Sequence, residues 1–228
     1  MLYYLLFMAP GLILALIATV MTRMTFSRYA RVASGSGMTG AEAAQRLLAT
    51  QGVRDVTVEQ VDGFLSDHYD PTSKTLRLSP AVYGSSSLAA IGVACHEAGH
   101  ALQHATGYAW LGMRTALVPA TQFGSNASYI FFLMGMFFHH PMFYVIGTIL
   151  FCVVVVFALI TLPVEWDASA RAKRLMVMSG VVSPREQEDA GRVLNAAFMT
   201  YVAAAVTALL TLLYYLVRSG LIGGRRDD

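Results

Sequence analysis

The chain has 228 residues, of which 56% are hydrophobic and 13% charged, and its formal net charge is +2 at neutral pH. This composition, with a mean hydropathy of +0.54, excludes an ordinary soluble domain. So small a net charge gives no reason to expect a nucleic-acid partner. Cys95 and Cys152 are two lone thiols, which excludes a disulfide framework.

Three long stretches of the chain carry no Asp, Glu, Lys or Arg and are rich in apolar residues. A membrane-spanning helix needs about 20 such residues, and His139-His140-Pro141 divides the middle stretch in two. The sequence therefore predicts a mainly α-helical protein of the lipid bilayer. Its four transmembrane helices are predicted over residues 2–22, 115–138, 142–163 and 194–217.

The basic residues predict how the chain is oriented in the membrane. Lys and Arg gather in two polar regions, 23–114 and 164–192, and none lies between the second and third spans. The positive-inside rule places both regions in the cytoplasm and both termini outside. The first span is interpreted as an uncleaved anchor, because no basic residue precedes it and Arg23 follows it. Residues 1–228 are expected to form one membrane-embedded domain.

Local signals predict a short helix and two strands after the first span. Thr39 with Glu42 three residues later makes a capping box, and the amphipathic helix that follows ends at Gly52. Residues 53–61 alternate imperfectly between apolar and polar types, and residues 74–79 alternate cleanly. An Asp-Pro turn signal separates the two runs. They predict a small β-hairpin element.

The second predicted strand contains Leu76, Arg77 and Leu78, and two interpretations of it stay open. As an exposed edge strand beside a zinc helix, it would hold a substrate backbone by β-augmentation. As part of an ordinary hairpin, it would only cover the core.

The stretch His96-Glu97-Ala98-Gly99-His100 fits the H-E-x-x-H pattern of zinc-binding helices. A helix is predicted over residues 86–106, because serines precede it as caps and Gly107 follows it as a stop signal. The two histidines then lie about 40° apart on one face, one turn apart, so both imidazoles can bind one Zn²⁺. Glu97 can reach a water on that ion, and burying it among small apolar residues is costly without such a role.

A catalytic zinc takes three protein ligands and keeps one position for water. His104 lies too far along the helix, about 12 Å beyond His96, and is expected to contact a ligand or to close the helix. After the motif helix the chain crosses the membrane outward through 115–138 and returns through 142–163. Glu165 therefore emerges on the same side of the membrane, and at the same depth, as the motif helix. Glu165, followed by Ala168, is therefore the predicted third ligand of a single Zn²⁺.

The second polar region opens at Pro163, which either kinks the third span or starts a new helix. Asp167 and Arg171 stand four residues apart and are expected to pair. Ser179-Gly180 predicts a helix end, and Ser183-Pro184 predicts the start of the last helix.

Six runs of residues stand together in this chain: His68-Tyr69-Asp70-Pro71, Leu76-Arg77-Leu78-Ser79-Pro80, Val82-Tyr83, the run Ala89 to Gln103, Pro163-Val164-Glu165 and Asp167-Ala168-Ser169. In this combination the chain resembles a family, the bacterial membrane-embedded neutral zinc metallopeptidases, often called YugP-like. The resemblance covers nearly the whole chain and implies a multi-pass, zinc-dependent peptidase of the bacterial plasma membrane. Its substrates would be membrane proteins or peptides, and a membrane-protein partner is left open.

The chain is also similar, more distantly, to the Ste24-like membrane proteases, which combine H-E-x-x-H with a later E-x-x-A. Those proteases usually carry an acidic residue four positions after the ligand glutamate, where it orients a ligand histidine. Here Ser169 stands at that position, and the nearby acid is Asp167. Which of these two residues supports the ligands is left open.

The predicted reaction is metal-assisted hydrolysis of peptide bonds at the cytoplasmic membrane surface. Glu97 is the predicted general base, taking a proton from the attacking water and passing it to the leaving amine. A charged or polar donor would stabilise the oxyanion, and the sequence does not choose among His68, Tyr83 and Arg171.

Two other functions compete with the peptidase. The first is a metal-binding membrane scaffold, or a subunit of a larger complex, without proteolysis, although such a protein has no need of Glu97. The second is a small transporter, but the spans carry no buried acid or base.

Overall fold

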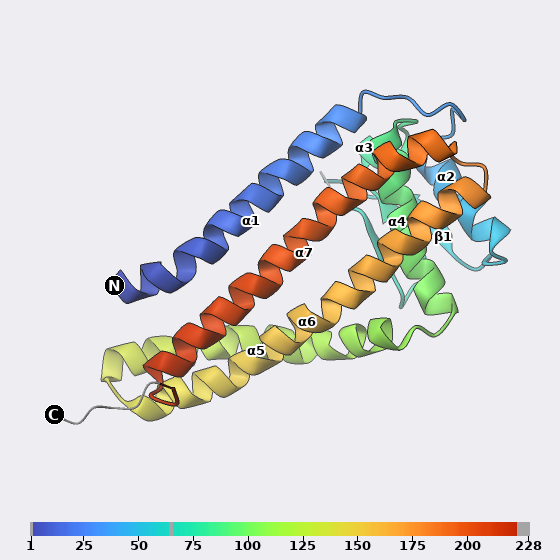
Figure 1. The fold of residues 1–228 in the computed structure, drawn as a ribbon. Coiled ribbons are helices and arrows are strands. Elements are labelled where there is room, and N and C mark those ends of the chain that lie inside the picture. Colours follow the sequence, from blue (N-terminus) through green and yellow to red (C-terminus); the bar gives the residue numbers. More distant parts are fainter. Residues whose placement is uncertain (1, 64–65, 223–228) are drawn as a thin grey trace. The chain divides into compact units, whose positions relative to one another are not determined.

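The computed structural model describes residues 2–63 and 66–222, with side chains from Phe7 onward, and this part of the chain is mainly helical with one small sheet. Contacts divide it into two compact units. The first holds the described parts of residues 1–17, 113–163 and 201–228, and the second holds Ala18–Gly112 and Val164–Thr200. The single domain stays a prediction. In chain order the elements are α1 (Leu2–Tyr29), α2 (Gly40–Thr50), β1 (Thr57–Gln60), β2 (His68–Asp70), β3 (Thr75–Leu78), α3 (Pro80–Tyr83), α4 (Leu88–Ala105), α5 (Ala109–Phe138), α6 (Pro141–Met178) and α7 (Pro184–Arg218) (Figure 1).

The first unit is built from parts of α1, α5, α6 and α7. Small residues let these helices approach closely, as where a Cβ on Gly11 of α1 would lie 2.8 Å from Thr207 Oγ1 of α7. Aromatic rings fill the remaining space, and Phe132 of α5 stacks on Tyr215 of α7 with ring centroids 3.7 Å apart. Close approach at small residues is typical of helices that pack in a membrane.

Three helical stretches are long and apolar enough to cross a membrane, judged by length and composition: Phe7–Tyr29, Pro141–Met178 and Pro184–Arg218. They contain the third and fourth predicted spans and residues 7–22 of the first. The remaining predicted span, 115–138, lies in α5, which is helical throughout but is not among the three. Polar side chains within α5 lower its hydropathy: Thr121, Gln122, Ser125, Asn126 and Ser128.

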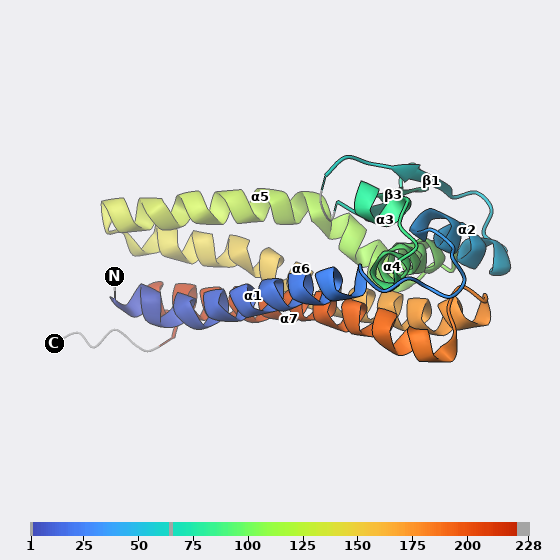
Figure 2. The ribbon, with the colours of Figure 1, turned by 90° about the horizontal axis from the view of Figure 1, so that it is seen from above.

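Helix α4, which carries the H-E-x-x-H motif, lies at the centre of the second unit. Figure 2 shows α3 and the sheet on one side of α4 and the ends of α6 and α7 on the other. Its N-terminus is capped as predicted, because the Ser87 side chain accepts a hydrogen bond from the Ala90 N–H. Gly107 follows the helix end with φ of +62°, the left-handed conformation that glycine adopts at a helix stop.

The predicted amphipathic helix is α2, and it packs against α4. Thr39 and Glu42 form the expected capping box: the Thr39 Oγ1 accepts from the Glu42 N–H, and the Glu42 carboxylate accepts from the Thr39 N–H at 2.8 Å. The buried apolar face consists of Ala41, Ala43, Ala44, Leu47 and Leu48.

The sheet corrects one prediction. Its strand order is β1-β3-β2, with β3 parallel to β1 and antiparallel to β2. The hairpin is therefore β2–β3, and the two predicted strands, β1 and β3, pair in parallel instead of forming a hairpin. Leu76, Arg77 and Leu78 lie in the central strand: Leu76 and Arg77 pair with both neighbouring strands, and Leu78 pairs with Gln60 of β1. The prediction of an exposed edge strand is therefore wrong, and contact of these residues with a substrate stays a prediction.

Pro163, just before Glu165, lies in the interior of a helix, and the Gly and Ser-Pro signals that follow mark the boundary between α6 and α7. Pro163 lies inside α6, so no new helix starts there. Gly180, with φ of +68°, ends α6, and a capping box opens α7, in which the Glu186 carboxylate accepts from the Ser183 N–H at 2.8 Å. The predicted pair of Asp167 and Arg171 forms, at 2.6 Å.

Candidate metal centre

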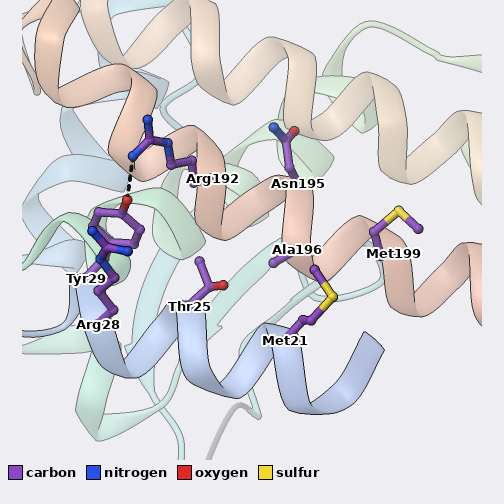
Figure 3. Close-up of a pocket in the computed structure, with 8 residues that line it drawn as sticks. All are labelled: Met21, Thr25, Arg28, Tyr29, Arg192, Asn195, Ala196 and Met199. Atoms are coloured by element: carbon purple, nitrogen blue, oxygen red, sulfur yellow. Dashed lines mark hydrogen bonds between the residues drawn. The ribbon is translucent and has the colours of Figure 1, made fainter. Parts of the chain in front are cut away.

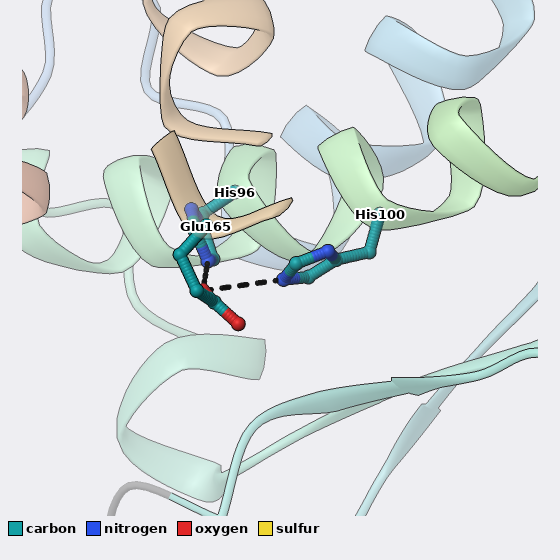
Figure 4. Close-up of side chains that lie close together, drawn as sticks. All are labelled: His96, His100 and Glu165. Atoms are coloured by element: carbon teal, nitrogen blue, oxygen red, sulfur yellow. Dashed lines mark hydrogen bonds and ion pairs between the residues drawn. The ribbon is translucent and has the colours of Figure 1, made fainter. Parts of the chain in front are cut away.

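His96 and His100 project from one face of α4, as their spacing predicts, with ring centroids 4.8 Å apart. The Glu165 carboxylate of α6 meets both of them. Its Oε2 lies 3.1 Å from His96 Nε2 and 3.5 Å from His100 Nε2 (Figure 4). One potential ligand atom from each residue lies within 4.8 Å of the other two. Among the described residues, no other group of three His, Cys, Asp or Glu side chains gathers in this way.

Two small residues let α6 deliver Glu165 to this point. A Cβ on Gly99 would lie 2.6 Å from the Ala168 carbonyl oxygen, so only glycine lets the two backbones come this close. Glu165 stands one turn before Ala168 on the same buried side of α6. The glycine inside the motif therefore sets the reach of the third side chain.

The three side chains fit a zinc ion by their chemistry. Two imidazole nitrogens and one carboxylate oxygen make the three-ligand set of a hydrolytic zinc site, which leaves a position for water. Glu165 is only 1% exposed, and a carboxylate so deeply buried is costly to hold without positive charge or hydrogen-bond donors around it. His100 is also buried, and His96 is partly open to solvent.

The Nδ1 atom of each histidine, which faces away from Glu165, also has a hydrogen-bond partner. The Ser169 Oγ lies 3.1 Å from His96 Nδ1. The Gln103 Oε1, which can only accept, takes a hydrogen bond from His100 Nδ1 at 3.0 Å. A proton on Nδ1 leaves the lone pair on Nε2, the nitrogen that faces Glu165, so the second contact fixes the tautomer that a metal requires.

Gln103 connects α4 to α6 and was missed from the sequence. It is fully buried, and its Nε2 donates to the Val164 carbonyl oxygen at 2.8 Å and to Asp167 Oδ2 at 2.9 Å. The same Asp167 oxygen accepts from Arg171 Nε. Asp167 thus acts on His100 through Gln103, whereas Ser169 contacts His96 directly. A glutamine one turn after the second histidine of the motif was the available signal.

The charges of the site favour a cation between the histidines. Burial alone would lower the pKa of His100, but the Glu165 and Glu97 carboxylates outweigh it and raise this pKa above its ordinary value. Protons and a metal ion compete for the same nitrogen, so acid is expected to release the metal.

The remaining residues that were predicted to belong to the site lie at different distances from the two histidines and Glu165. Glu97 is buried on α4 beside the histidines. His104 is removed from the cluster and binds the Tyr69 hydroxyl through Nδ1 at 2.8 Å. His68 is an exposed residue of β2, Tyr83 ends α3, and the Arg171 guanidinium lies over the Tyr108 ring. Which of His68, Tyr83 and Arg171 would stabilise an oxyanion stays a prediction.

Comparisons with known proteins agree with this chemistry. Residues 4–220 match the model of a family described as "Putative neutral zinc metallopeptidase". A relative from Bacillus subtilis (strain 168), named "Putative membrane protease YugP", is 45% identical over 195 residues, which cover 86% of this chain and 87% of the relative. No solved structure matches the chain. The distant similarity to Ste24-like proteases stays a prediction.

Proposed function

The chain belongs to the neutral zinc metallopeptidase family, and from this premise we propose that it is an endopeptidase that cleaves membrane proteins or peptides at the membrane surface. The observation that carries the proposal is the meeting of His96, His100 and Glu165, from two helices, around one point. Glu97, adjacent to one of these residues on α4, supplies the acid–base group that hydrolysis needs.

In the proposed mechanism His96, His100 and Glu165 hold one zinc ion. Zinc bound there supplies a Lewis acid for the scissile carbonyl and lowers the pKa of water. Glu97 accepts a proton from the attacking water as its oxygen joins the carbonyl carbon. Glu97 then returns that proton to the amide nitrogen as the carbon–nitrogen bond breaks, so the products are a carboxylic acid and an amine, between which the remaining acidic proton is shared at neutral pH. Ser169 and Gln103 keep the two imidazoles in place throughout.

Metal removal tests the proposal. Full-length protein in detergent is expected to cleave fluorescent casein, to lose this activity after treatment with a zinc chelator, and to regain it with Zn²⁺. Mg²⁺ and Ca²⁺ should not restore it, since two imidazoles and one carboxylate favour zinc over cations that prefer all-oxygen sites. Elemental analysis should find about one zinc per active chain. Full activity in the metal-free protein would refute the proposed mechanism.

We further propose four spans, with the metal centre on the cytoplasmic face and both termini outside. Support comes from the distribution of Lys and Arg and from the length of α5, whose 30 residues extend about 45 Å and exceed the hydrocarbon thickness. Met1 and residues 223–228 lie outside the described part of the chain.

Cysteine labelling tests this topology. In a background that carries Cys152→Ser, we expect His139→Cys to react with a membrane-impermeant maleimide on intact cells. We expect Ser73→Cys, in the exposed turn before β3, to react only after the cells are opened. Labelling of both positions from the same side would remove α5 from the set of spans and contradict the proposed orientation.

A further inference from the structure

A groove of about 370 Å³ opens between α1 and α7 in the second unit, separate from the metal centre (Figure 3). One end of the groove is basic and the other is apolar. Arg28 of α1 and Arg192 of α7 line the basic end, and Met21, Ala196 and Met199 line the apolar end. The peptidase mechanism uses none of these residues.

A buried tyrosine positions both arginines. Tyr29 is only 4% exposed, and its hydroxyl accepts a hydrogen bond from the Arg192 guanidinium at 2.9 Å. The Arg28 guanidinium lies over the Tyr29 ring, 5.5 Å from its centroid. Two positive charges from different helices are thus held by one rigid side chain.

Little negative charge offsets this pair. Arg192 contacts Asp189 one turn earlier on α7, at 3.1 Å, where the Arg192 side chain is 58% exposed and the Asp189 side chain 38% exposed. Among the described residues no carboxylate forms an ion pair with Arg28. A second shallow groove on α1, lined by Arg23, Arg28 and Arg31, extends the basic surface. The basic end therefore favours an anion.

The groove also lies where two apolar helices become polar. On α1 the residues before Arg23 are uncharged, and on α7 Arg192 is the last charged residue before the uncharged stretch 193–217. Arg28 and Arg192 thus mark the level at which a membrane span meets the lipid headgroups. The Thr22 hydroxyl donates to the Ala196 carbonyl oxygen at 2.9 Å and ties the two helices together beside the groove.

We propose that this groove binds an anionic phospholipid. Its phosphate would lie between Arg28 and Arg192, whose planar guanidinium groups match phosphate oxygens in geometry and charge. The first carbons of an acyl chain would lie against Met21 and Met199, flexible side chains that adapt to an apolar ligand. The Asn195 Oδ1 accepts a hydrogen bond from Lys173 Nζ, so the amide N–H groups of Asn195 would act as donors to a phosphate oxygen.

Native mass spectrometry of the full-length protein in detergent tests the proposal. The probes are phosphatidylglycerol, phosphatidylcholine and inorganic phosphate. We expect one phosphatidylglycerol to bind at least about tenfold more tightly than phosphatidylcholine, because the second lipid cancels the charge of its own phosphate. Inorganic phosphate should compete weakly, since it lacks the acyl chain that the apolar end accommodates.

Variants connect the binding to this groove. The double variant Arg28→Gln/Arg192→Gln should lower the affinity for phosphatidylglycerol about 100-fold, at about tenfold for each charged hydrogen-bonding group. Arg174→Gln removes one positive charge from an exposed position of α6 and should have little effect. Tyr29→Phe, which loses the hydroxyl but keeps the ring, should cause an intermediate loss.

Arg192→Lys is a milder substitution that retains the charge. It serves as the test variant if the double variant does not fold. It should still weaken binding several-fold, because Lys lacks the planar fork. Equal affinity for the two lipids would overturn the proposal. So would equal loss of binding in the Arg174→Gln control, which would indicate general surface charge, or full competition by inorganic phosphate, which would indicate a free-anion site.

Discussion

Replacing Glu97 with Gln is expected to abolish peptide hydrolysis while zinc stays bound. The amide has the size of the carboxylate but cannot take a proton from water, and loss of a general base costs about 10² to 10⁴ in rate. Glu97 is not one of the three side chains that meet at the metal centre, so the zinc content should equal that of the wild type. The measurements are casein cleavage and zinc per chain on the same preparation.

The matched control for this variant is Glu188→Gln, which removes a carboxylate from an exposed position of α7 and should leave cleavage unchanged. Undiminished cleavage by the Glu97→Gln protein would refute the peptidase mechanism. The scaffold function would be favoured by a different pair of phenotypes. Cells that carry Glu97→Gln would behave like the wild type, whereas cells that carry His96→Ala would behave like cells without the protein.

Replacing Glu165 with Gln is expected to remove zinc from the protein. The substitution keeps the volume of a fully buried side chain, so the fold should persist, but it withdraws the negative charge and the ligand oxygen that face both histidines. Loss of a residue that only hydrogen-bonds to a metal ligand lowers metal affinity about 10 to 100-fold. Loss of a ligand itself should lower the zinc affinity by at least about 100-fold. Competition with a zinc-sensitive dye measures this affinity.

Asp167→Asn is the control for Glu165→Gln. Asp167 is two residues away on α6 and contacts Gln103 instead of a histidine. The Asp167→Asn substitution should lower the zinc affinity by no more than about 10 to 100-fold, the loss typical of a residue that only hydrogen-bonds toward a ligand. If Glu165→Gln binds zinc as tightly as the wild type, Glu165 is not a ligand and the three-residue site is disproved.

The sequence predicted best those features that depend on neighbouring residues. Thr39, Ser87 and Ser183 each start a helix by accepting a hydrogen bond from the N–H group three residues later, so a short window contains all the necessary information. Glu165 was a longer inference. It rested on the membrane crossings between it and the motif, and the structure brings it beside His96 and His100.

The features that the sequence did not predict depend on distant partners. Strand β3 lies between β1, in parallel, and β2, a strand of three residues that is too short to show an alternating pattern. Gln103 takes its role from Val164 and Asp167, more than sixty residues later in the chain. Ordinary helix residues give no sign of such partners until the helices are placed against each other.

The second unit is assembled from two separate segments, Ala18–Gly112 and Val164–Thr200, and this division affects how the protein is made. The two histidines and Glu97 belong to the earlier segment and Glu165 to the later one. At about 5 to 20 residues per second, ribosomal synthesis takes about 3 to 13 s to pass from His100 to Glu165. During that interval Gly99 has no Ala168 carbonyl to pack against, and the candidate metal centre lacks its third side chain. A nascent chain therefore carries the motif of the peptidase well before it carries the site.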